Sequence, residues 1–457
     1  MATLKVIHPG NGKLLREVEE LGRDEALARL IAAREAFAQW RETPFAERRR
    51  LMERAAEILR AERDELAQLM TEEMGKPIAA AESEAEKCAW VCEYFAEHAE
   101  GFLAEEAIAS DAGESVVRFE PLGPVLAIMP WNFPFWQLFR FAAPGLMAGN
   151  VGLLKHAPNV PGCAQAITDL FLRAGFPEGV FTNLQVSNEI VAEIIARPEV
   201  AAVTLTGSVR AGRAVASEAG GAIKKTVLEL GGSDPFIVLA DADLESTLEN
   251  AVLARTINSG QSCIAAKRFI VVDEIADRFI AGMTERIERL KVGDPFERDN
   301  DVGPLARRDL VENLSRQVDE SVAAGAQVLT GGRVLEREGF YYAPTVLDRV
   351  VPGMAAFDEE TFGPVAAIVH AASTEEALKL ANETSYGLGA SLWTSDAKSG
   401  RELATRVQAG AVFVNGIVKS DPRLPFGGIK ESGYGRELSA FGIREFVNVK
   451  TVWIAPS

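Results

Sequence analysis

Short apolar runs alternate with stretches of helical periodicity from about residue 115 onward, and this alternation constrains the fold more than any other feature of the sequence. A strand–helix alternation of this kind predicts parallel sheets with helices on their faces. We therefore expect an α/β fold, with a second α/β unit after Gly260. The apolar runs lie at residues 125–129, 151–155, 202–205, 226–228 and 236–239, and then at 269–272, 365–369 and 411–414.

The chain of 457 residues is too long for one ordinary hydrophobic core, so we expect two or three domains. The first hundred residues predict helices, one of which ends at Gly75. Residues 164–174 predict a further helix, which ends at Gly175. Residues 446–454 have a strand-like, partly apolar pattern.

The charge balance and the cysteine content narrow the class of protein. A net charge of −18 opposes binding to nucleic acid or to an anionic membrane, because both require basic patches. No apolar run reaches about 18 residues, and four unevenly spaced cysteines give no disulfide framework, so we expect a reduced, cytoplasmic protein. Cysteines and histidines form no cluster at ligand spacing, so we expect no metal site. We interpret three of the cysteines as packing residues, namely Cys88, Cys92 and Cys163.

Two short motifs carry candidate catalytic groups. Cys263 ends the sequence GQSC, whose small residues suggest a turn with backbone N–H groups near a ligand, and a thiolate there would be a nucleophile. The alternative for Cys263 is a small buried hydrophobic side chain. Glu229 lies in LELGG, at the apolar end of a run, where desolvation raises the pKa of a carboxyl toward that of a general base. The alternative for Glu229 is a carboxylate that points to solvent.

A third motif, WNFP, places Asn132 between prolines and aromatic residues. A fixed side-chain amide can donate to a developing oxyanion, whereas the alternative is an aromatic loop packed on the core. A thiol, a carboxylate and an amide together indicate covalent catalysis at an aldehyde or acyl carbon.

No Walker loop and no Gly-x-Gly-x-x-Gly sequence follows a strand, so a phosphate site must be sought elsewhere. Gly207 and Ser208 follow an apolar run and would begin a helix, whose N-terminal amides attract phosphate. An ordinary strand-to-helix turn explains the same residues. Lys155 ends another run, where it could reach a ribose or phosphate or could be a solvated charge.

Six motifs in this order resemble the aldehyde dehydrogenase superfamily, and the resemblance covers nearly the whole chain. The motifs are WNFP at 131–134, TGS at 206–208, LELGG at 228–232, GQSC at 260–263, ETFGP at 360–364 and PFGG at 425–428. The resemblance implies that Cys263 is the nucleophile, that Asn132 and the Cys263 amide hold the oxyanion, and that Glu229 activates the hydrolytic water. It implies a Rossmann-like cofactor domain, an α/β catalytic domain and a small β oligomerisation extension.

The resemblance also implies NAD or NADP as cofactor. The expected cofactor-binding residues are Trp131 and Lys155 near the adenosine ribose, Gly207 and Ser208 at the pyrophosphate, and Leu230, Glu360 and Phe362 near the nicotinamide. One departure bears on the choice between the two cofactors. Many members of the superfamily have Lys-Pro-Ser-Glu where this chain has KHAP, and Pro158 lacks the carboxylate that repels a 2′-phosphate. We therefore expect that NADP is not excluded.

The expected substrate-binding residues are Trp136, Arg140, Ser420 and Phe426. Trp136 and Arg140 are four residues apart and share one helix face. An arginine in an aromatic tunnel suggests a substrate carboxylate, and the alternative is a structural ion pair. The short chain, the Lys-His-Ala run and this arginine are features that resemble those of compact bacterial succinate-semialdehyde dehydrogenases. The substrate expected is a small aldehyde with a carboxylate, and the alternative is another small or uncharged aldehyde.

The same resemblance predicts the domain boundaries and the assembly. Residues 1–113 and 128–229 would form the NAD(P)-binding domain and 230–437 the catalytic domain. Residues 114–127 and 438–457 would join subunits into a homodimer or homotetramer. Rival classes are a cysteine hydrolase or thioesterase without nicotinamide, a non-catalytic relative, and an acylating enzyme that uses coenzyme A. The hydrolase would need a histidine base, for which His370 is the only candidate after Cys263.

Overall fold

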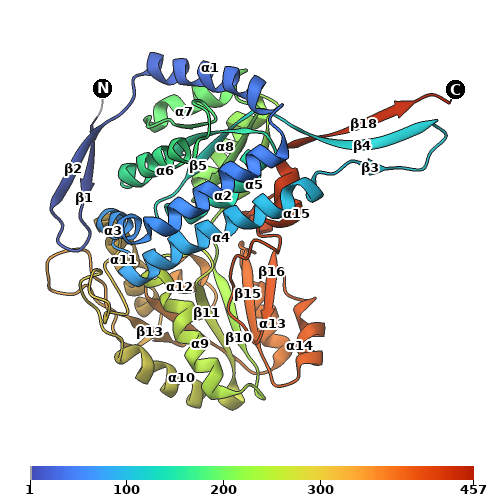
Figure 1. Cartoon of the computed structure of the whole chain (residues 1–457). Helices are drawn as coiled ribbons and strands as arrows, with labels where there is room; N and C mark the ends of the chain where they lie inside the picture. Colours follow the sequence, from blue (N-terminus) through green and yellow to red (C-terminus); the bar gives the residue numbers. More distant parts are fainter. Residues whose placement is uncertain (1–2, 457) are drawn as a thin grey trace.

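Two sheets of mainly parallel strands, each with its own hydrophobic core, form the body of this computed structural model, which describes residues 3–456 (Figure 1). Strands β8 (Ala202–Thr206), β10 (Asp234–Val238) and β11 (Ala266–Val272) are buried at every residue, as expected for parallel strands that helices cover on both faces. The α/β fold predicted from the alternation is confirmed, but the second unit begins before Gly260, because β10 already belongs to the second sheet.

The first sheet has the order β17-β9-β8-β5-β6-β7, and all its neighbouring strands are parallel except β17 and β9. Its strands are β5 (Pro124–Met129), β6 (Val151–His156), β7 (Phe181–Asn183), β8 (Ala202–Thr206), β9 (Lys225–Glu229) and β17 (Gly433–Tyr434). Its helices are α1 (Arg23–Trp40), α2 (Phe45–Ala61), α3 (Arg63–Met74), α4 (Ile78–Phe102), α5 (Trp136–Met147), α6 (Pro161–Ala174), α7 (Asn188–Ala196) and α8 (Val209–Gly221). The predicted helix ends at Gly75 and Gly175 are confirmed, since both glycines adopt the left-handed conformation.

The second sheet has the order β12-β13-β14-β11-β10-β15-β16, in which only β12 and β13 are antiparallel. Its strands are β10 (Asp234–Val238), β11 (Ala266–Val272), β12 (Gln327–Thr330), β13 (Thr345–Asp348), β14 (Val365–Ala371), β15 (Gly389–Trp393) and β16 (Ala411–Val414). Its helices are α9 (Leu244–Thr256), α10 (Asp273–Glu288), α11 (Arg308–Ala323), α12 (Ala355–Asp358), α13 (Thr374–Asn382) and α14 (Ala397–Ala404). Short helices η1 (Ile257–Gly260), η2 (Lys430–Ser432), α15 (Ser439–Ile443) and η3 (Arg444–Phe446) lie in the connections.

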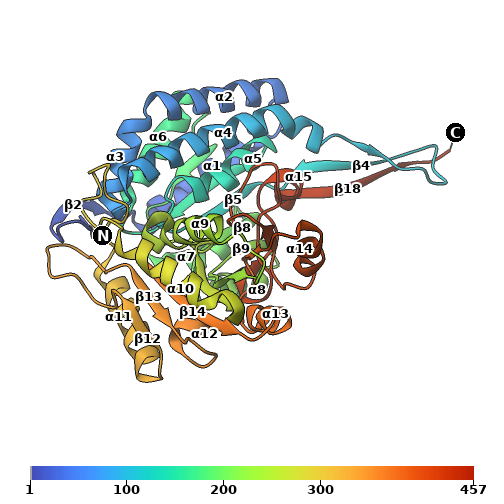
Figure 2. The ribbon, with the colours of Figure 1, turned by 90° about the horizontal axis from the view of Figure 1, so that it is seen from below.

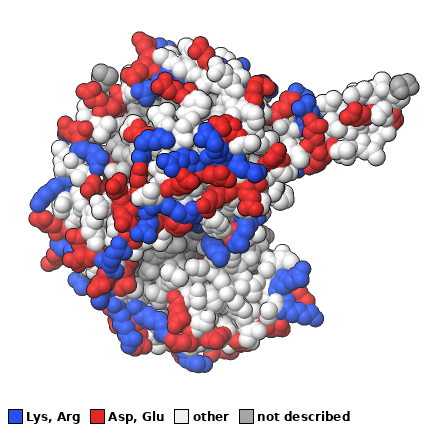
Figure 3. Space-filling view, viewed as in Figure 1, with Lys and Arg blue, Asp and Glu red and all other residues white. Residues whose placement is uncertain are grey.

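A narrow arm projects from the body (Figures 1 and 2). It consists of β3 (Glu106–Ala107), β4 (Glu114–Pro121) and β18 (Val447–Ile454), and β18 pairs with β4 along its whole length. Figure 3 shows acidic and basic side chains intermixed over the helices of the first body and fewer charges toward the tip of the arm. Strand β18 of the arm exposes three large apolar side chains, Val449, Trp453 and Ile454.

The N-terminal segment corrects the expectation of helix throughout the first hundred residues. Strands β1 (Thr3–Ile7) and β2 (Leu14–Glu19) form an antiparallel hairpin ahead of α1. The Gly- and Asn-containing turn between them is typical of a hairpin, and this short signal was outweighed by the long helical pattern that follows. Within the part of the chain that the structure describes, no helix is long and apolar enough to cross a membrane.

Candidate active site

Predicted site residues lie at the carboxyl ends of three neighbouring strands of the first sheet. Asn132 follows β5, Ser208 follows β8, and Glu229 ends β9, and these strands lie next to one another in the order β9-β8-β5. Cys263 comes from the second body, between η1 and β11. The candidate site therefore lies where the two bodies meet, at the sheet edge where α/β proteins bind ligands.

One cavity of about 330 Å³ collects most of the predicted catalytic and cofactor residues. Its predicted lining residues are Trp131, Asn132, Gly207, Ser208, Leu230, Cys263, Glu360 and Phe362. Sequence reasoning missed Pro130, Gln137, Thr206, Gly231, Arg307, Leu310 and Asn313. Several of these residues lie next to a motif in the sequence, and this proximity could have identified them as lining residues. Arg307 and Asn313, from the start of α11, had no such signal.

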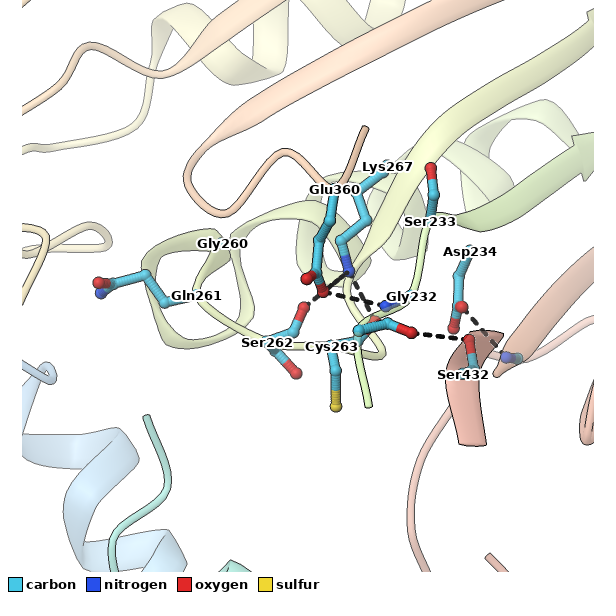
Figure 4. A network of polar contacts seen from close by, with 12 residues as sticks. Gly232, Ser233, Asp234, Gly260, Gln261, Ser262, Cys263, Lys267, Glu360 and Ser432 are labelled. Carbon is cyan, nitrogen blue, oxygen red and sulfur yellow. Dashed lines mark hydrogen bonds and ion pairs between the residues drawn. The ribbon is translucent and has the colours of Figure 1, made fainter. Parts of the chain in front are cut away.

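Cys263 lies in a dense polar network (Figure 4). The ammonium of Lys267, which is fully buried, donates to the carbonyl oxygens of Ser262 (2.8 Å) and Cys263 (2.6 Å) and lies 3.8 Å from the carboxylate of Glu360. Glu360 also accepts a hydrogen bond from the backbone N–H of Gly232 at 3.0 Å. The turn that carries the thiol is thereby tied to the residue predicted to bind the nicotinamide ribose.

Burial raises the pKa of the Cys263 thiol to about 12, and the positive charges of Arg140 and then Lys267 oppose this increase. At neutral pH the group is therefore the thiol, and its activation requires a base or a change of surroundings when ligands bind. The other three cysteines are fully buried, in agreement with their interpretation as packing residues.

Close packing explains why glycine occupies position 260 of the GQSC motif. Gly260 has a φ of +79°, and a β-carbon there would lie 2.3 Å from the backbone of Gly363. A β-carbon on Gly231 would lie 2.6 Å from the carboxylate of Glu360. These glycines let the LELGG, GQSC and ETFGP motifs approach one another.

Hydrogen bonds fix Asn132 through both its side chain and its backbone. Its Nδ2 donates to the carbonyl oxygen of Gln261 at 3.0 Å, and its backbone carbonyl accepts from Nδ2 of Asn258 at 2.7 Å. Because an amide nitrogen has two protons, one donor of Asn132 remains for a ligand in the cavity that it shares with Cys263.

Glu229 is buried, and neither of its carboxylate oxygens has a hydrogen-bond partner among the described residues. Burial, and then the neighbouring carboxylate of Glu437, raise the pKa of Glu229 well above its ordinary value, while Arg140 acts in the opposite direction. The alternative of a solvated carboxylate does not match this position. An environment of this kind suits a general base.

Arg140, on α5, already has a carboxylate partner. Its Nε lies 2.6 Å from Oε2 of Glu437, its guanidinium lies 4.6 Å from the ring centre of Phe426, and its Nη2 is 3.4 Å from Oγ1 of Thr206. Arg140 and Phe426 thus contact each other, but neither lines the main cavity. The geometry favours the ion-pair alternative for Arg140, and no substrate contact of either residue follows from it.

Trp136 and Ser420 do meet, as predicted for two residues of one substrate site. The indole Nε1 of Trp136 donates to Oγ of Ser420 at 2.9 Å. Sequence reasoning missed a third member of this group, Lys87 on α4, whose ammonium donates to the same oxygen at 3.0 Å. Lys87 gave no signal because it is separated from Ser420 by 333 positions.

The region predicted for the adenosine half of the cofactor is a separate, small pocket. Lys155 and Pro158 both line it, together with Glu20 from the end of β2. The ammonium of Lys155 donates to Oδ1 of Asn188 at 2.8 Å. Ser208 caps α8 by accepting from the N–H of Ala211 at 3.2 Å. The N-terminus of α8 adjoins the main cavity, where its backbone N–H groups can attract a phosphate.

Comparison with known proteins decides the family. The model of the Aldehyde dehydrogenase family matches residues 1–452. The chain belongs to the aldehyde dehydrogenase family. The hydrolase and non-catalytic alternatives therefore lose their support. In addition, His370 contacts Asp348 on β13 at 2.8 Å and is no partner of Cys263.

This aldehyde dehydrogenase is similar over nearly its whole length to several named enzymes. It is 52% identical over 452 residues to a probable succinate-semialdehyde dehydrogenase [NADP(+)] of Synechocystis sp., an alignment that covers 99% of this chain and 100% of the relative. It is 51% identical over 455 residues to succinate-semialdehyde dehydrogenase [NADP(+)] 1 of Mycobacterium tuberculosis, with the same coverage. The crystal structure of the Streptococcus pyogenes succinic semialdehyde dehydrogenase in complex with NADP+ superimposes with a TM-score of 0.97 at 36% identity, covering 99% of this chain and 100% of that one.

Proposed function

We propose that this aldehyde dehydrogenase oxidises succinate semialdehyde to succinate, with NADP as the preferred cofactor and NAD as a possible substitute. The main support is that the thiol of Cys263, the amide of Asn132 and all the predicted cofactor residues except Lys155 share one cavity. The names of the full-length relatives support the substrate and the cofactor. Pro158, which cannot repel a 2′-phosphate, also agrees with NADP.

The first step uses the nucleophile and the oxyanion donors. The thiol of Cys263 loses its proton to a water molecule as its sulfur adds to the aldehyde carbon, and the resulting oxyanion accepts from the free N–H of Asn132 and from the backbone N–H of Cys263. A nicotinamide held near Glu360 and Phe362 would supply the hydride acceptor that conversion of this Cys263 adduct to a thioester requires. Glu360, held by Lys267 and Gly232, would position the nicotinamide ribose.

The second step is hydrolysis of the thioester. Glu229 would take a proton from a water molecule as its oxygen adds to the thioester carbon, and the carboxylic acid then leaves as the sulfur of Cys263 is released. Its raised pKa makes Glu229 a stronger base than an exposed carboxylate, and the charge of Arg140 favours the ionised form that the step requires. A base for water favours hydrolysis over transfer to coenzyme A.

The remaining predictions concern assembly, domains and location. We propose that the arm joins two or more subunits, because its apolar side chains Val449, Trp453 and Ile454 are exposed in the single chain. The domain division at residues 113, 127, 229 and 437 and the cytoplasmic location stay predictions from the sequence.

The test is the production of reduced nicotinamide, followed by its absorbance. Succinate semialdehyde, glutarate semialdehyde and butanal would be offered with each cofactor to the natural protein and to Cys263→Ser. We expect the highest kcat/KM with succinate semialdehyde and NADP, and a fall of at least about 1,000-fold in the variant. A higher kcat/KM with butanal would overturn the substrate, and full activity of Cys263→Ser would overturn the mechanism.

A further inference from the structure

Buried side chains hold the carbonyl oxygen of every residue in the GQSC turn. The donor–acceptor pairs are Arg255 to Gly260 at 2.8 Å, Asn132 and Asn258 to Gln261 at 3.0 and 3.1 Å, and Lys267 to Ser262 and Cys263 at 2.8 and 2.6 Å. Each of the four donor residues is almost completely buried. Lys267 alone holds two carbonyl groups of the turn, and in the chain these two lie on either side of the backbone N–H of Cys263.

The turn needs such restraints because it follows a strained segment. Asn258, Ser259 and Gly260 all have positive φ values, of +53°, +57° and +79°. A left-handed conformation is unfavourable for asparagine and serine, and it persists only where the surrounding structure fixes it. The buried donors at the carbonyl groups of the turn provide that fixation. We therefore expect the turn to relax when one of these donors is removed.

The backbone N–H of Cys263 is free to bind a ligand. In a planar trans peptide this N–H points away from the carbonyl oxygen of Ser262, which Lys267 holds. Figure 4 shows the sulfur of Cys263 pointing away from the ammonium of Lys267. No described residue accepts the N–H of Cys263, and Cys263 lines the main cavity. The ammonium thus fixes the peptide through its carbonyl group, while the N–H remains available to an oxyanion.

The ammonium of Lys267 has no position left for a substrate. It has three protons, and its neighbours are the two carbonyl oxygens and the carboxylate of Glu360 at 3.8 Å. Lys267 is fully buried and is not among the residues that line the main cavity. Burial lowers the pKa of Lys267, whereas the charges of Glu360 and then Asp234 raise it. Any contribution of Lys267 to the reaction must therefore act through the turn that it holds.

We infer that Lys267 is a positioning residue, which sets the orientation of the backbone N–H of Cys263 that binds the oxyanion. The inference rests on the proposed function, since it concerns the oxyanion step of that reaction. Without the ammonium, the carbonyl groups of Ser262 and Cys263 would be left buried with no donor, and the peptide between the two residues would rotate toward other donors. Arg268 cannot replace Lys267, because its guanidinium donates to carbonyl groups outside the turn.

Two reactions of the same sulfur separate the orientation of the N–H from the nucleophilicity of the thiol. With p-nitrophenyl acetate, the sulfur of Cys263 adds to the ester carbon, the thiol proton passes to water and p-nitrophenolate leaves, so an acetyl thioester remains. This reaction passes through a tetrahedral oxyanion. With iodoacetamide, the sulfur displaces iodide and no oxyanion forms. The ratio of the two rate constants in the cofactor-free enzyme therefore reports on the oxyanion donors, because any effect of Lys267 on the thiolate fraction cancels.

The experiment measures this ratio in the natural protein and in variants of Lys267. In Lys267→Met we expect acylation to fall at least about tenfold relative to alkylation, because the N–H of Cys263 is no longer held in place. Lys267→Arg keeps donors for the two carbonyl groups and should recover most of the ratio. Asn132→Ala, which removes the other oxyanion donor, is the positive control. Arg268→Met removes an equally buried cation and should retain the ratio.

Thermal unfolding checks the fold of each variant. If Lys267→Met does not fold, Lys267→Gln takes its place, and because its amide can still donate to one carbonyl group, we expect a fall of at least about threefold in the ratio. Any smaller fall in the ratio would overturn the inference.

The ester reaction also separates this inference from the proposed function, because it requires neither the cofactor nor succinate semialdehyde. If the natural protein fails to oxidise succinate semialdehyde but the ratio still falls in Lys267→Met, the proposed function is wrong and the positioning role stands. If the ester does not acylate Cys263 of the natural protein, as judged against Cys263→Ser, both the inference and the proposed mechanism are overturned.

Discussion

Nε of Arg140 lies 2.6 Å from Oε2 of Glu437, and both side chains are almost completely buried. The pair lies beside Glu229, whose pKa responds to both partners in opposite directions. Arg140 therefore balances two buried carboxyls, Glu229 and Glu437. This arrangement links a position predicted for substrate binding to the stability of the fold.

Removal of Arg140 should destabilise the protein. Arg140→Met leaves Glu437 buried without its partner, so we expect a loss of roughly 3–5 kcal/mol in the free energy of unfolding. Arg140→Met combined with Glu437→Gln should recover part of that loss, as measured by denaturant unfolding. Kinetics should show similar losses for succinate semialdehyde and butanal. A KM increase confined to succinate semialdehyde would instead return Arg140 to the substrate site.

The reactivity of Cys263 should depend on pH without a plateau near neutrality. Because the pKa of the thiol is raised to about 12, the thiolate fraction of the cofactor-free enzyme should rise about tenfold per pH unit from pH 7 to 10. The rate of inactivation by iodoacetamide measures this fraction, and Cys263→Ser gives the background. Lys267→Met should react more slowly at each pH because a nearby positive charge is lost, whereas Lys267→Arg should resemble the natural protein. A plateau below pH 8 would contradict the raised pKa.

Asn132 should act on the chemical step more than on binding. Asn132→Ala removes one oxyanion donor, so kcat should fall about 10²- to 10³-fold with little change in KM. Asn132→Asp keeps the shape of the side chain but places negative charge near the oxyanion, so its kcat should be lower still. Cofactor binding, followed by tryptophan fluorescence, should be retained in both variants. An unchanged kcat in Asn132→Ala would exclude the oxyanion role.

Pro158 should govern the choice between the two cofactors. A carboxylate at this position would repel the 2′-phosphate of NADP, so Pro158→Glu should lower kcat/KM for NADP by at least about tenfold and affect NAD less. Pro158→Gln is the uncharged control and should show a smaller change. A preference of the natural protein for NAD by more than about 100-fold would contradict the interpretation of Pro158, since that corresponds to roughly 2.7 kcal/mol.

The sequence was sufficient to predict residues that lie close to a motif. Asn132, Gly207 and Cys263 each stand at the end of an apolar run or in a turn, so their local pattern placed them at the sheet edge where the cavity is found. Most of the parallel strands could also be predicted, because a strand that is buried on both faces has a continuous apolar sequence. Strand β13, at Thr345–Asp348, was missed although its sequence TVLD is as apolar as the predicted run TVL at 226–228.

Partners that are distant in the chain could not be predicted in this way. In the sequence, Arg140 lies in an aromatic segment, and nothing near it identifies its partner. Its ion pair with Glu437 depends on how the residues after β17 fold back onto α5. Likewise, no local pattern distinguishes Lys87 from other lysines on a helix. Its contacts with Trp136 and Ser420 depend on how α4, α5 and the residues after β16 pack together.

The contact between Gly260 and the backbone of Gly363 has a mechanical consequence. This contact packs the segment that carries the sulfur tightly against the segment that carries Glu360 and Phe362. Neither segment can shift unless the other follows. A displacement of Glu360 would then be passed to the turn that carries the sulfur. Even one added methyl group at position 260 would force the two segments apart and put hydride donor and acceptor out of alignment.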